Sequence, residues 1–316
     1  MRFVTYLLLA GIVLFSGYWA LAAHLGTSQA GAILDRAPSL SGQTGRVRGY
    51  PLEFETEIQA PRWQNAAGNT GWQAETVTLT VPSLRPATAT LQFPPRHQID
   101  VAGQTHLLQT RDMTARITAQ TDLTLSAARL DLEAATLDPP LGMHTLGPVS
   151  AHLHHRTGRQ YALQIDAGDI VLSPETLALI DPAQTLSAAI TTLRMTAELH
   201  FSAPFDLRGS VPALTDIALD ALHVIWDDVE IGLEGQITRD AAGLLDGALR
   251  LSLSDWQVLH QLLTGSGLLS DDAAMMAGML LASQAEPGST AITLGLDLSA
   301  STLSLGPFAL LQLPPL

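Results

Sequence analysis

The chain has 316 residues, enough for one large or two ordinary domains. Its formal net charge is −14 and all 16 basic residues are Arg, which disfavours a nucleic-acid partner because phosphate contacts need clustered Lys and Arg. The sequence contains no Cys, which excludes disulfides, thiolate nucleophiles and Cys-ligated zinc.

The N-terminus predicts a membrane segment. No charged residue occurs from Phe3 to Ala23, and at about 1.5 Å per residue a helix of this length spans roughly 31 Å, close to the hydrocarbon core of a bilayer. Arg2 precedes the run and the next basic residue is Arg36, which orients the N-terminus inside and the bulk outside. We therefore expect residues 1–23 to anchor the protein in the inner membrane, with the bulk in the periplasm.

A cleaved signal peptide is the alternative for the same segment. Ala20-Leu21-Ala22 resembles the small-x-small pattern of a cleavage site. Cleavage there would release the protein into the periplasm. The globular part is exported in both cases.

A linker and an alternating strand follow. Residues 24–48 are expected to hold a short helix, Ser28–Arg36, and a Gly- and Ser-rich connector, Ser39–Gly45. From Gly49 onward apolar and acidic residues alternate, which predicts a strand with one buried face and one solvated face. A second such strand is predicted over Ala74–Val81. The apolar positions of the two strands form a predicted apolar lining: Leu52, Phe54, Ile58, Val77, Leu79 and Val81.

Similar short alternating segments continue to the C-terminus. They are interrupted by a break at Asp138–Gly142 and by three short helices, of which Pro174–Ile180 is preceded by Ser173 as a cap. The other two helices are expected over Asp255–Leu263 and Asp271–Gln284, the last of which is expected to bury Met275, Met276, Met279 and Leu280.

This pattern predicts a mainly β fold (β-rich α+β): long, curved, mostly antiparallel sheets with a few short peripheral helices and an N-terminal membrane helix. Residues 49–316 are expected to form one β-rich exported domain, with a candidate sub-boundary near residues 138–148.

Candidate chemical sites are sparse. His152 and His154 would share one face of a strand, where zinc or copper would need a third and a fourth ligand, one of them from Asp166 or Asp169. A solvated strand face is the favoured interpretation, and we expect no metal site. Asp227-Asp228 is interpreted as a turn rather than as an acid–base pair. Because no nucleophile or phosphate-binding motif occurs, we expect no catalytic residue, no cofactor and no enzymatic activity.

The long apolar alternation itself is the main functional pattern. An apolar sheet face has to be covered, and two outcomes remain open. The sheet encloses a partly open groove that binds lipid or another hydrophobic ligand, or it folds over itself into a filled sandwich.

Several segments, taken in order, resemble a bacterial family known as domain of unknown function 2125. They are the N-terminal anchor, Arg48–Phe54, Trp72, Val81–Pro86, Gly247–Leu251, Asp255-Trp256, Gly306-Pro307 and Leu313–Leu316. The resemblance implies an envelope location and a β-rich fold, and it carries no catalytic residues over.

In the general pattern of its sequence the chain is more distantly similar to AsmA-like envelope proteins, which are associated with lipid movement. We therefore expect a membrane-anchored protein that binds lipid or another hydrophobic ligand. The alternative is an envelope scaffold or assembly factor that binds protein partners through its sheet edges.

Overall fold

The computed structural model describes residues 40–45, 47–49, 51–64, 70–101, 103–182, 184–208, 212–240, 242–265, 271–285, 289–306 and 308–313. Within these ranges the fold is mainly β, with twenty strands and three helices. The chain divides into two compact units. Unit 1 takes its residues from Met1–Leu130 and Phe205–Val211, and unit 2 from Asp131–Pro204 and Pro212–Leu316.

Unit 1 is built around the long strand β2. The strands of this unit are β1 (Leu40–Thr44), β2 (Glu53–Gln64), β3 (Thr70–Ala74), β4 (Thr76–Pro82), β5 (Thr88–Gln92), β6 (Arg96–Val101), β7 (Gln104–Arg111), β8 (Thr114–Ala119) and the first part of β9 (Leu125–Leu132). The first half of β2 pairs with β4, which continues through β5 to β8. Its second half pairs with β3, which continues through β6 to β7.

The change of partner along β2 occurs at Ala60-Pro61. Ala60 has a positive φ of 46°, and its backbone N–H donates to Glu75 O at 2.8 Å. Glu75 is the residue between β3 and β4. The pairing is therefore interrupted at the same level in β2 and in the segment opposite it. As a result, β2 takes part in two branches of the sheet.

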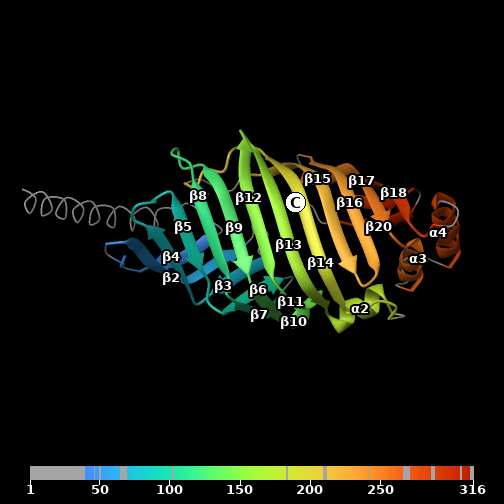
Figure 1. The fold of residues 1–316 in the computed structure, drawn as a ribbon, viewed down its shortest axis with the longest axis horizontal. Helices are drawn as coiled ribbons and strands as arrows, with labels where there is room; N and C mark the ends of the chain where they lie inside the picture. The colour runs from blue at the N-terminus through green and yellow to red at the C-terminus, as the bar shows by residue number, and fades with distance from the viewer. Residues whose placement is uncertain are drawn as a thin grey trace, which may run out of the picture. The chain divides into compact units, whose positions relative to one another are not determined.

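Unit 2 is an antiparallel meander (Figure 1). Its strands are β10 (Ala134–Leu141), β11 (Met143–Leu146), β12 (Val149–Thr157), β13 (Gln160–Leu172), β14 (Ala189–Phe201), β15 (Leu214–Trp226), β16 (Val229–Arg239), β17 (Leu245–Leu253), β18 (Ile292–Ser299), β19 (Thr302–Leu305) and β20 (Phe308–Gln312). From β12 to β20 each strand pairs with the next one in the chain. Sequential antiparallel pairing is what short turns such as Gly158-Arg159 and Asp227-Asp228 produce.

Three helices are described, all in unit 2. They are α2 (Pro174–Ile180), α3 (Trp256–Gly265) and α4 (Asp271–Gln284). The hydroxyl of Ser173 accepts a hydrogen bond from Thr176 N at 3.1 Å and caps α2, as predicted. At the other end of α2 the Asp181 carboxylate accepts hydrogen bonds from Leu186 N and Thr185 Oγ1. Burial of Asp181 works against its charge, but these hydrogen bonds hold its pKa below the ordinary value.

The predicted fold class is confirmed in its coarse form, a mainly β protein with antiparallel strands and few short helices. The predicted anchor (residues 1–23) and the linker helix lie outside the described residues. In the part of the chain that is described, no helix is both long and apolar enough to cross a membrane. Residues 138–148, the candidate sub-boundary, lie in unit 2.

Three details differ from the sequence-based prediction. The connector expected at Ser39–Gly45 contains β1, which pairs with β2. Strand β20 was not predicted. The break expected at Asp138–Gly142 is wrong, because β10 continues to Leu141. Its pairing with β11 moves directly from Thr136 to Leu141, so Pro139 and Pro140, which have no N–H to donate, lie where that ladder is interrupted.

Candidate functional site

The main candidate is one face of the unit 2 sheet. Residues directly opposite one another on paired strands share a face, and following these pairs across seven strands gives continuous rows. The central row consists of Ala151, Ile165, Met195, Leu222, Leu233, Leu251 and Leu294. The next row on the same face consists of Val149, Ala167, Leu193, Val224, Ile231, Leu253 and Ile292. Both rows are apolar throughout.

The opposite face of the same strands is polar. One row there consists of Ser150, Asp166, Arg194, His223, Gly232, Ser252 and Thr293. Ion pairs cross this face between neighbouring strands, from Arg194 to Asp166 at 3.5 Å and from Arg250 to Glu234 at 2.6 Å. Along these rows the sheet is thus amphipathic from β12 to β18, and one face there calls for an apolar cover.

The apolar face is tightly packed at the β18 side. Ile292, Leu294, Leu296 and Leu298 are between 3% and 5% exposed. Ile292, Leu294 and Leu296 form one cluster with Leu281 of α4 and Trp256 of α3. Here the sheet has a filled core.

Over the central strands the same face is less closely packed. Ile165, Met195, Leu222 and Leu233 are each only half-buried. They stand in the middle of the central row, between strands β13 and β16. This stretch is the part of the apolar face that is least covered by the rest of unit 2 among these rows.

Aromatic residues lie at the two ends of the central strands. At one end Trp226 and Val229 pack with Leu177 of α2 and Leu262 of α3, and Trp226 Nε1 donates to Ser187 O at 2.8 Å. At the other end the rings of Tyr161 and Phe201 meet edge to face with centroids 5.7 Å apart. The half-buried stretch therefore lies between two packed ends.

The lining predicted in unit 1 falls on one face of β2 and β4, apart from its first residue. Phe54 lies opposite Val81, and Ile58 lies opposite Val77, with Leu79 between them. Val77 is only 3% exposed. Leu52 differs from the prediction: a turn closed by Glu53 N and Gly49 O precedes β2, so Leu52 lies outside the strand and is 77% exposed.

Unit 1 also contains a buried polar cluster that the sequence did not reveal. His97 of β6 is 1% exposed, and its Nε2 lies 3.0 Å from Thr110 Oγ1, which in turn donates to Pro94 O. The rings of Trp72 and Phe93 lie 5.8 and 6.0 Å from the His97 ring. Burial lowers the pKa of His97, and the nearby Pro94 carbonyl offsets this only in part. The imidazole is therefore held neutral and serves as a structural group.

Next to His97 is a cavity of about 640 Å³. Its walls include the side chains of Gln73, Gln98 and Gln109 with Arg96, and Gln73 Nε2 donates a hydrogen bond to Gln98 Oε1. Pro95 and Leu107 also line this cavity, so its lining mixes amide groups with apolar side chains.

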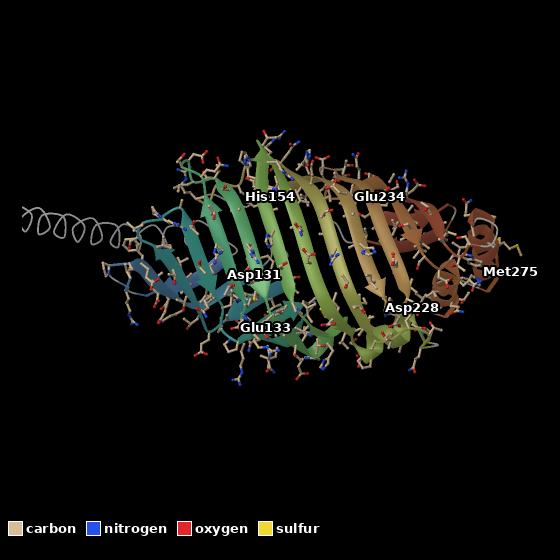
Figure 2. All side chains as sticks on the ribbon, in the orientation of Figure 1. Asp131, Glu133, His154, Asp228, Glu234 and Met275 are labelled. Carbon is tan, nitrogen blue, oxygen red and sulfur yellow. The ribbon has the colours of Figure 1, made fainter. Side chains whose placement is uncertain are left out.

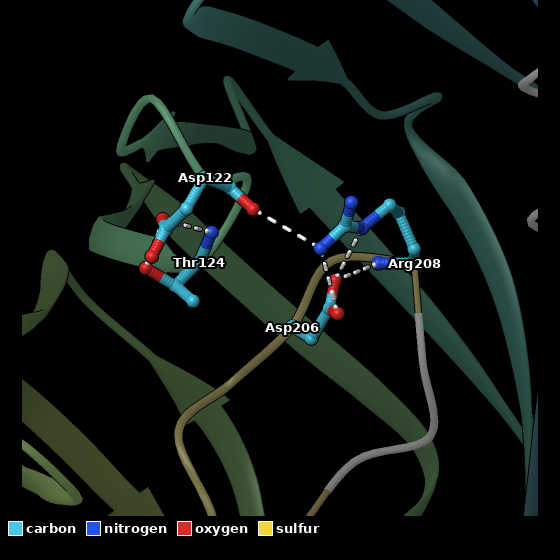
Figure 3. A network of polar contacts seen from close by, with 4 residues as sticks. All are labelled: Asp122, Thr124, Asp206 and Arg208. Carbon is cyan, nitrogen blue, oxygen red and sulfur yellow. Dashed lines mark hydrogen bonds and ion pairs between the residues drawn. The ribbon is translucent and has the colours of Figure 1, made fainter.

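A second polar network in unit 1 fastens residues 206–208 to the turn before β9 (Figure 3). The guanidinium of Arg208 donates to both Asp206 carboxylate oxygens, at 2.9 and 3.0 Å, and to Asp122 O at 3.1 Å. Asp122 Oδ1 accepts from the hydroxyl and the backbone N–H of Thr124. The hydrogen bonds from Thr124 lower the pKa of Asp122, and those from Arg208 lower the pKa of Asp206. All these groups are satisfied by one another, which indicates a structural role.

The candidate metal site does not gain further ligands in the structure. His152 lies opposite Gln164 and His154 lies opposite Ala162; Figure 2 labels His154 on β12. Asp166 accepts a hydrogen bond from Gln164 and pairs with Arg194. Across the described ranges no group of three or more His, Cys, Asp or Glu side chains is arranged to hold a metal ion.

Asp227 and Asp228 form the turn between β15 and β16, as predicted. The Asp227 carboxylate accepts hydrogen bonds from the N–H and the hydroxyl of Ser187, at 2.6 and 2.7 Å. These bonds lower the pKa of Asp227. The carboxylate thereby fixes the loop before β14.

The prediction that Met275, Met276 and Met279 are buried is wrong. All three are more than half exposed, and Figure 2 shows Met275 projecting away from α4. The helix instead packs through Gly278, where an added Cβ would lie 2.6 Å from His260 Nε2 of α3, and through Leu281, which is fully buried. The small residue Gly278 could have identified this face, because helices approach most closely where a side chain is missing.

Comparisons with known proteins identify a family and nothing more specific. No curated protein and no solved structure matches this chain. A family model described as "Uncharacterized protein conserved in bacteria" (DUF2125) matches residues 19–314. The chain therefore belongs to this bacterial family.

Proposed function

We propose that the protein is a non-enzymatic, membrane-anchored periplasmic protein that holds a lipid acyl chain or another hydrophobic ligand on the apolar face of unit 2. The observation that carries this proposal is the central apolar row, whose middle residues Ile165, Met195, Leu222 and Leu233 are half-buried. Covering such an apolar surface with a hydrophobic ligand is favourable, by about 25 cal/mol for each Å² removed from water. The anchor expected at residues 1–23 would bring the sheet close to a source of lipid.

A fluorescent fatty acid tests the proposal directly on the full chain. Met195→Glu places a charge in the middle of the apolar face, whereas Thr196→Glu places the same charge on the exposed polar face one residue along β14. We expect the wild-type chain and Thr196→Glu to take up the probe in a stoichiometric amount, and Met195→Glu to lose this uptake. Annular lipid bound around a membrane anchor would be the same in all three proteins.

Two measurements complete the test. Circular dichroism establishes that Met195→Glu remains folded, and Met195→Gln, which adds polarity without charge, is expected to weaken uptake in the same direction. Native mass spectrometry of the wild-type chain is expected to show co-purified lipid. A wild-type chain that carries no lipid and takes up no probe would contradict the proposal.

The alternative function, an envelope scaffold that binds protein partners, has one observation in its favour. Met275, Met276 and Met279 are exposed together on α4, and exposed Met residues are common on adaptable protein-binding surfaces. Photo-crosslinking from position 276 in cells, compared with position 236 on the polar face of β16, separates the two functions. A stoichiometric protein partner captured only from position 276, together with a lipid-free chain, would favour the scaffold.

A further inference from the structure

Three loops of unit 1 meet at the same end of its strands. The turn at Pro51-Leu52 leads into β2, the turn Ser83–Ala87 joins β4 to β5, and the turn Gln120–Thr124 follows β8. Backbone hydrogen bonds hold this end together: Ser83 N donates to Leu52 O, and Ala119 N, at the end of β8, donates to Ala87 O. Because adjacent strands lie about 4.8 Å apart, the three loops occupy a line of about 14 Å from β2 to β8.

Each of these loops presents a leucine to solvent. Leu52 is 77% exposed, Leu84 is 82% exposed and Leu123 is 40% exposed. Among the described residues of unit 1, the only other large apolar side chain that is exposed to solvent is Trp63. Exposed apolar residues gathered at one end mark an interaction surface more strongly than single ones scattered over a protein.

The loops are ordered by contacts that leave the leucines outside. Ser83, next to Leu84, is only 3% exposed. Leu123 is flanked by Asp122 and Thr124, which belong to the network that Arg208 closes, and Leu123 O accepts a hydrogen bond from Leu207 N. The leucines are therefore held outward by structured turns, and little conformational entropy would be lost if they inserted elsewhere.

One arginine of these loops lies beside the leucines, whereas Arg48 pairs with Glu57 along β2. Arg85, next to Leu84, is exposed and has no ion-pair partner among the described residues. The Arg48 side chain is 73% exposed and lies 4.0 Å from Glu57 Oε1. In a chain of net charge −14 with 16 basic residues, a cation next to an exposed leucine is notable because guanidinium groups bind phosphate in a bidentate manner.

We propose that this end of unit 1 docks onto the surface of a lipid bilayer, with Leu52, Leu84 and Leu123 in the interface and Arg85 on a lipid phosphate. The inference rests on the proposed membrane location. Amphipathic surfaces of this composition bind where headgroups meet acyl chains, and a second contact strengthens a single anchor. Residues 1–23 would supply the tether, and this docking surface would fix the orientation of unit 1 on the bilayer.

The length of the linker permits this orientation. The first described residue, Leu40, lies opposite Trp63, whereas Leu52 lies at the other end of β2. The separation along the strand is about 36 Å at 3.3 Å per residue. Residues 24–39 can reach at most about 55 Å, so a membrane anchor and the leucine-bearing loops can meet the same bilayer.

The full chain has no Cys, so a single Leu84→Cys substitution gives one labelling position for the fluorophore NBD. Gln92→Cys is the matched control, because Gln92 is also exposed and lies at the opposite end of β5. Each labelled chain is reconstituted into vesicles of phosphatidylethanolamine and phosphatidylglycerol that carry doxyl-labelled lipid as a quencher. The expected result is a blue shift at position 84 and quenching several-fold stronger there than at position 92. Arg85→Gln should weaken the quenching at position 84.

The outcomes separate this inference from the function it rests on. If the chain floats with the vesicles and neither position is quenched, or both are quenched equally, the docking surface is wrong while the membrane location stands. If the chain does not float with the vesicles, both are wrong. Uptake of the fluorescent fatty acid by unit 2 is measured in the same samples, and its loss alone would leave the docking surface in place.

Discussion

The N–H and the hydroxyl of Ser187 both donate to the carboxylate of Asp227, at 2.6 and 2.7 Å, across 40 positions of sequence. This pair fixes the loop before β14 to the β15–β16 turn, beside the buried Trp226. We expect Asp227→Ala to lower the thermal unfolding midpoint of the protein. Asp228→Ala is the control at the neighbouring turn position, and it should leave the midpoint unchanged. Equal shifts for the two variants would contradict the assigned role of the Asp227 carboxylate.

The buried His97 predicts a dependence of stability on pH. Burial lowers the pKa of His97 in the folded protein, so between the unfolded value near 6.5 and the lower folded value the unfolded chain binds more protons. The contribution is therefore fully favourable above about pH 6.5, and stability is lost as the pH falls from there toward the folded pKa. Urea unfolding between pH 5 and 8 measures this loss.

His97→Gln removes the titrating group and should flatten the pH dependence, although it also lowers stability at neutral pH by altering the contact with Thr110. His154→Gln, which replaces an exposed histidine of β12, should retain the wild-type dependence. A wild-type slope in His97→Gln would show that other groups determine the acid sensitivity.

Much of the fold is predictable from local pattern. The alternation of Glu53, Glu55 and Glu57 with Phe54, Thr56 and Ile58 in β2, the Ser173-Pro174 start of α2 and the Asp227-Asp228 turn all follow from short-range preferences of side chains and backbone. These preferences also predicted the bounds of α4 correctly. They do not determine which face of α4 is buried, because that depends on the close approach of Gly278 to His260.

The sequence predicts that apolar sheet faces exist, but it predicts only some of the residues that form them. Alternation predicted apolar sheet faces, and Phe54, Ile58 and Val77 do share one. The extended rows of unit 2 depend on register across seven strands, which no single segment encodes. The His97 cluster was missed for a similar reason, since His97 and Thr110 come together only through the pairing of β6 with β7. Isolated histidines in a sequence give no indication that they are buried.

Two glycines of unit 2 predict opposite effects of the same substitution. Gly235 has a φ of 145°, and an added Cβ would lie 2.2 Å from Ala248 O. Gly235→Ala therefore requires the backbone to move, and we expect a loss of about 3 kcal/mol in the free energy of unfolding. Gly295 lies on the polar face, opposite Arg250, with nothing within 4 Å of an added Cβ, so Gly295→Ala should be neutral or stabilise by up to about 1 kcal/mol. Urea unfolding of both variants tests the register of β16 against β17.

The packing of α4 is tested by two residues two positions apart. Leu281 is fully buried and packs with Leu294 and Ile292 of β18, so Leu281→Ala should leave a cavity and cost about 2–5 kcal/mol. Met279 is 62% exposed, and Met279→Ala should change stability by less than about 0.5 kcal/mol. Because both substitutions shorten an apolar side chain on one helix, their difference measures orientation rather than helix propensity. A larger loss for Met279→Ala than for Leu281→Ala would mean that α4 is rotated, with its methionines in the core as the sequence alone predicts.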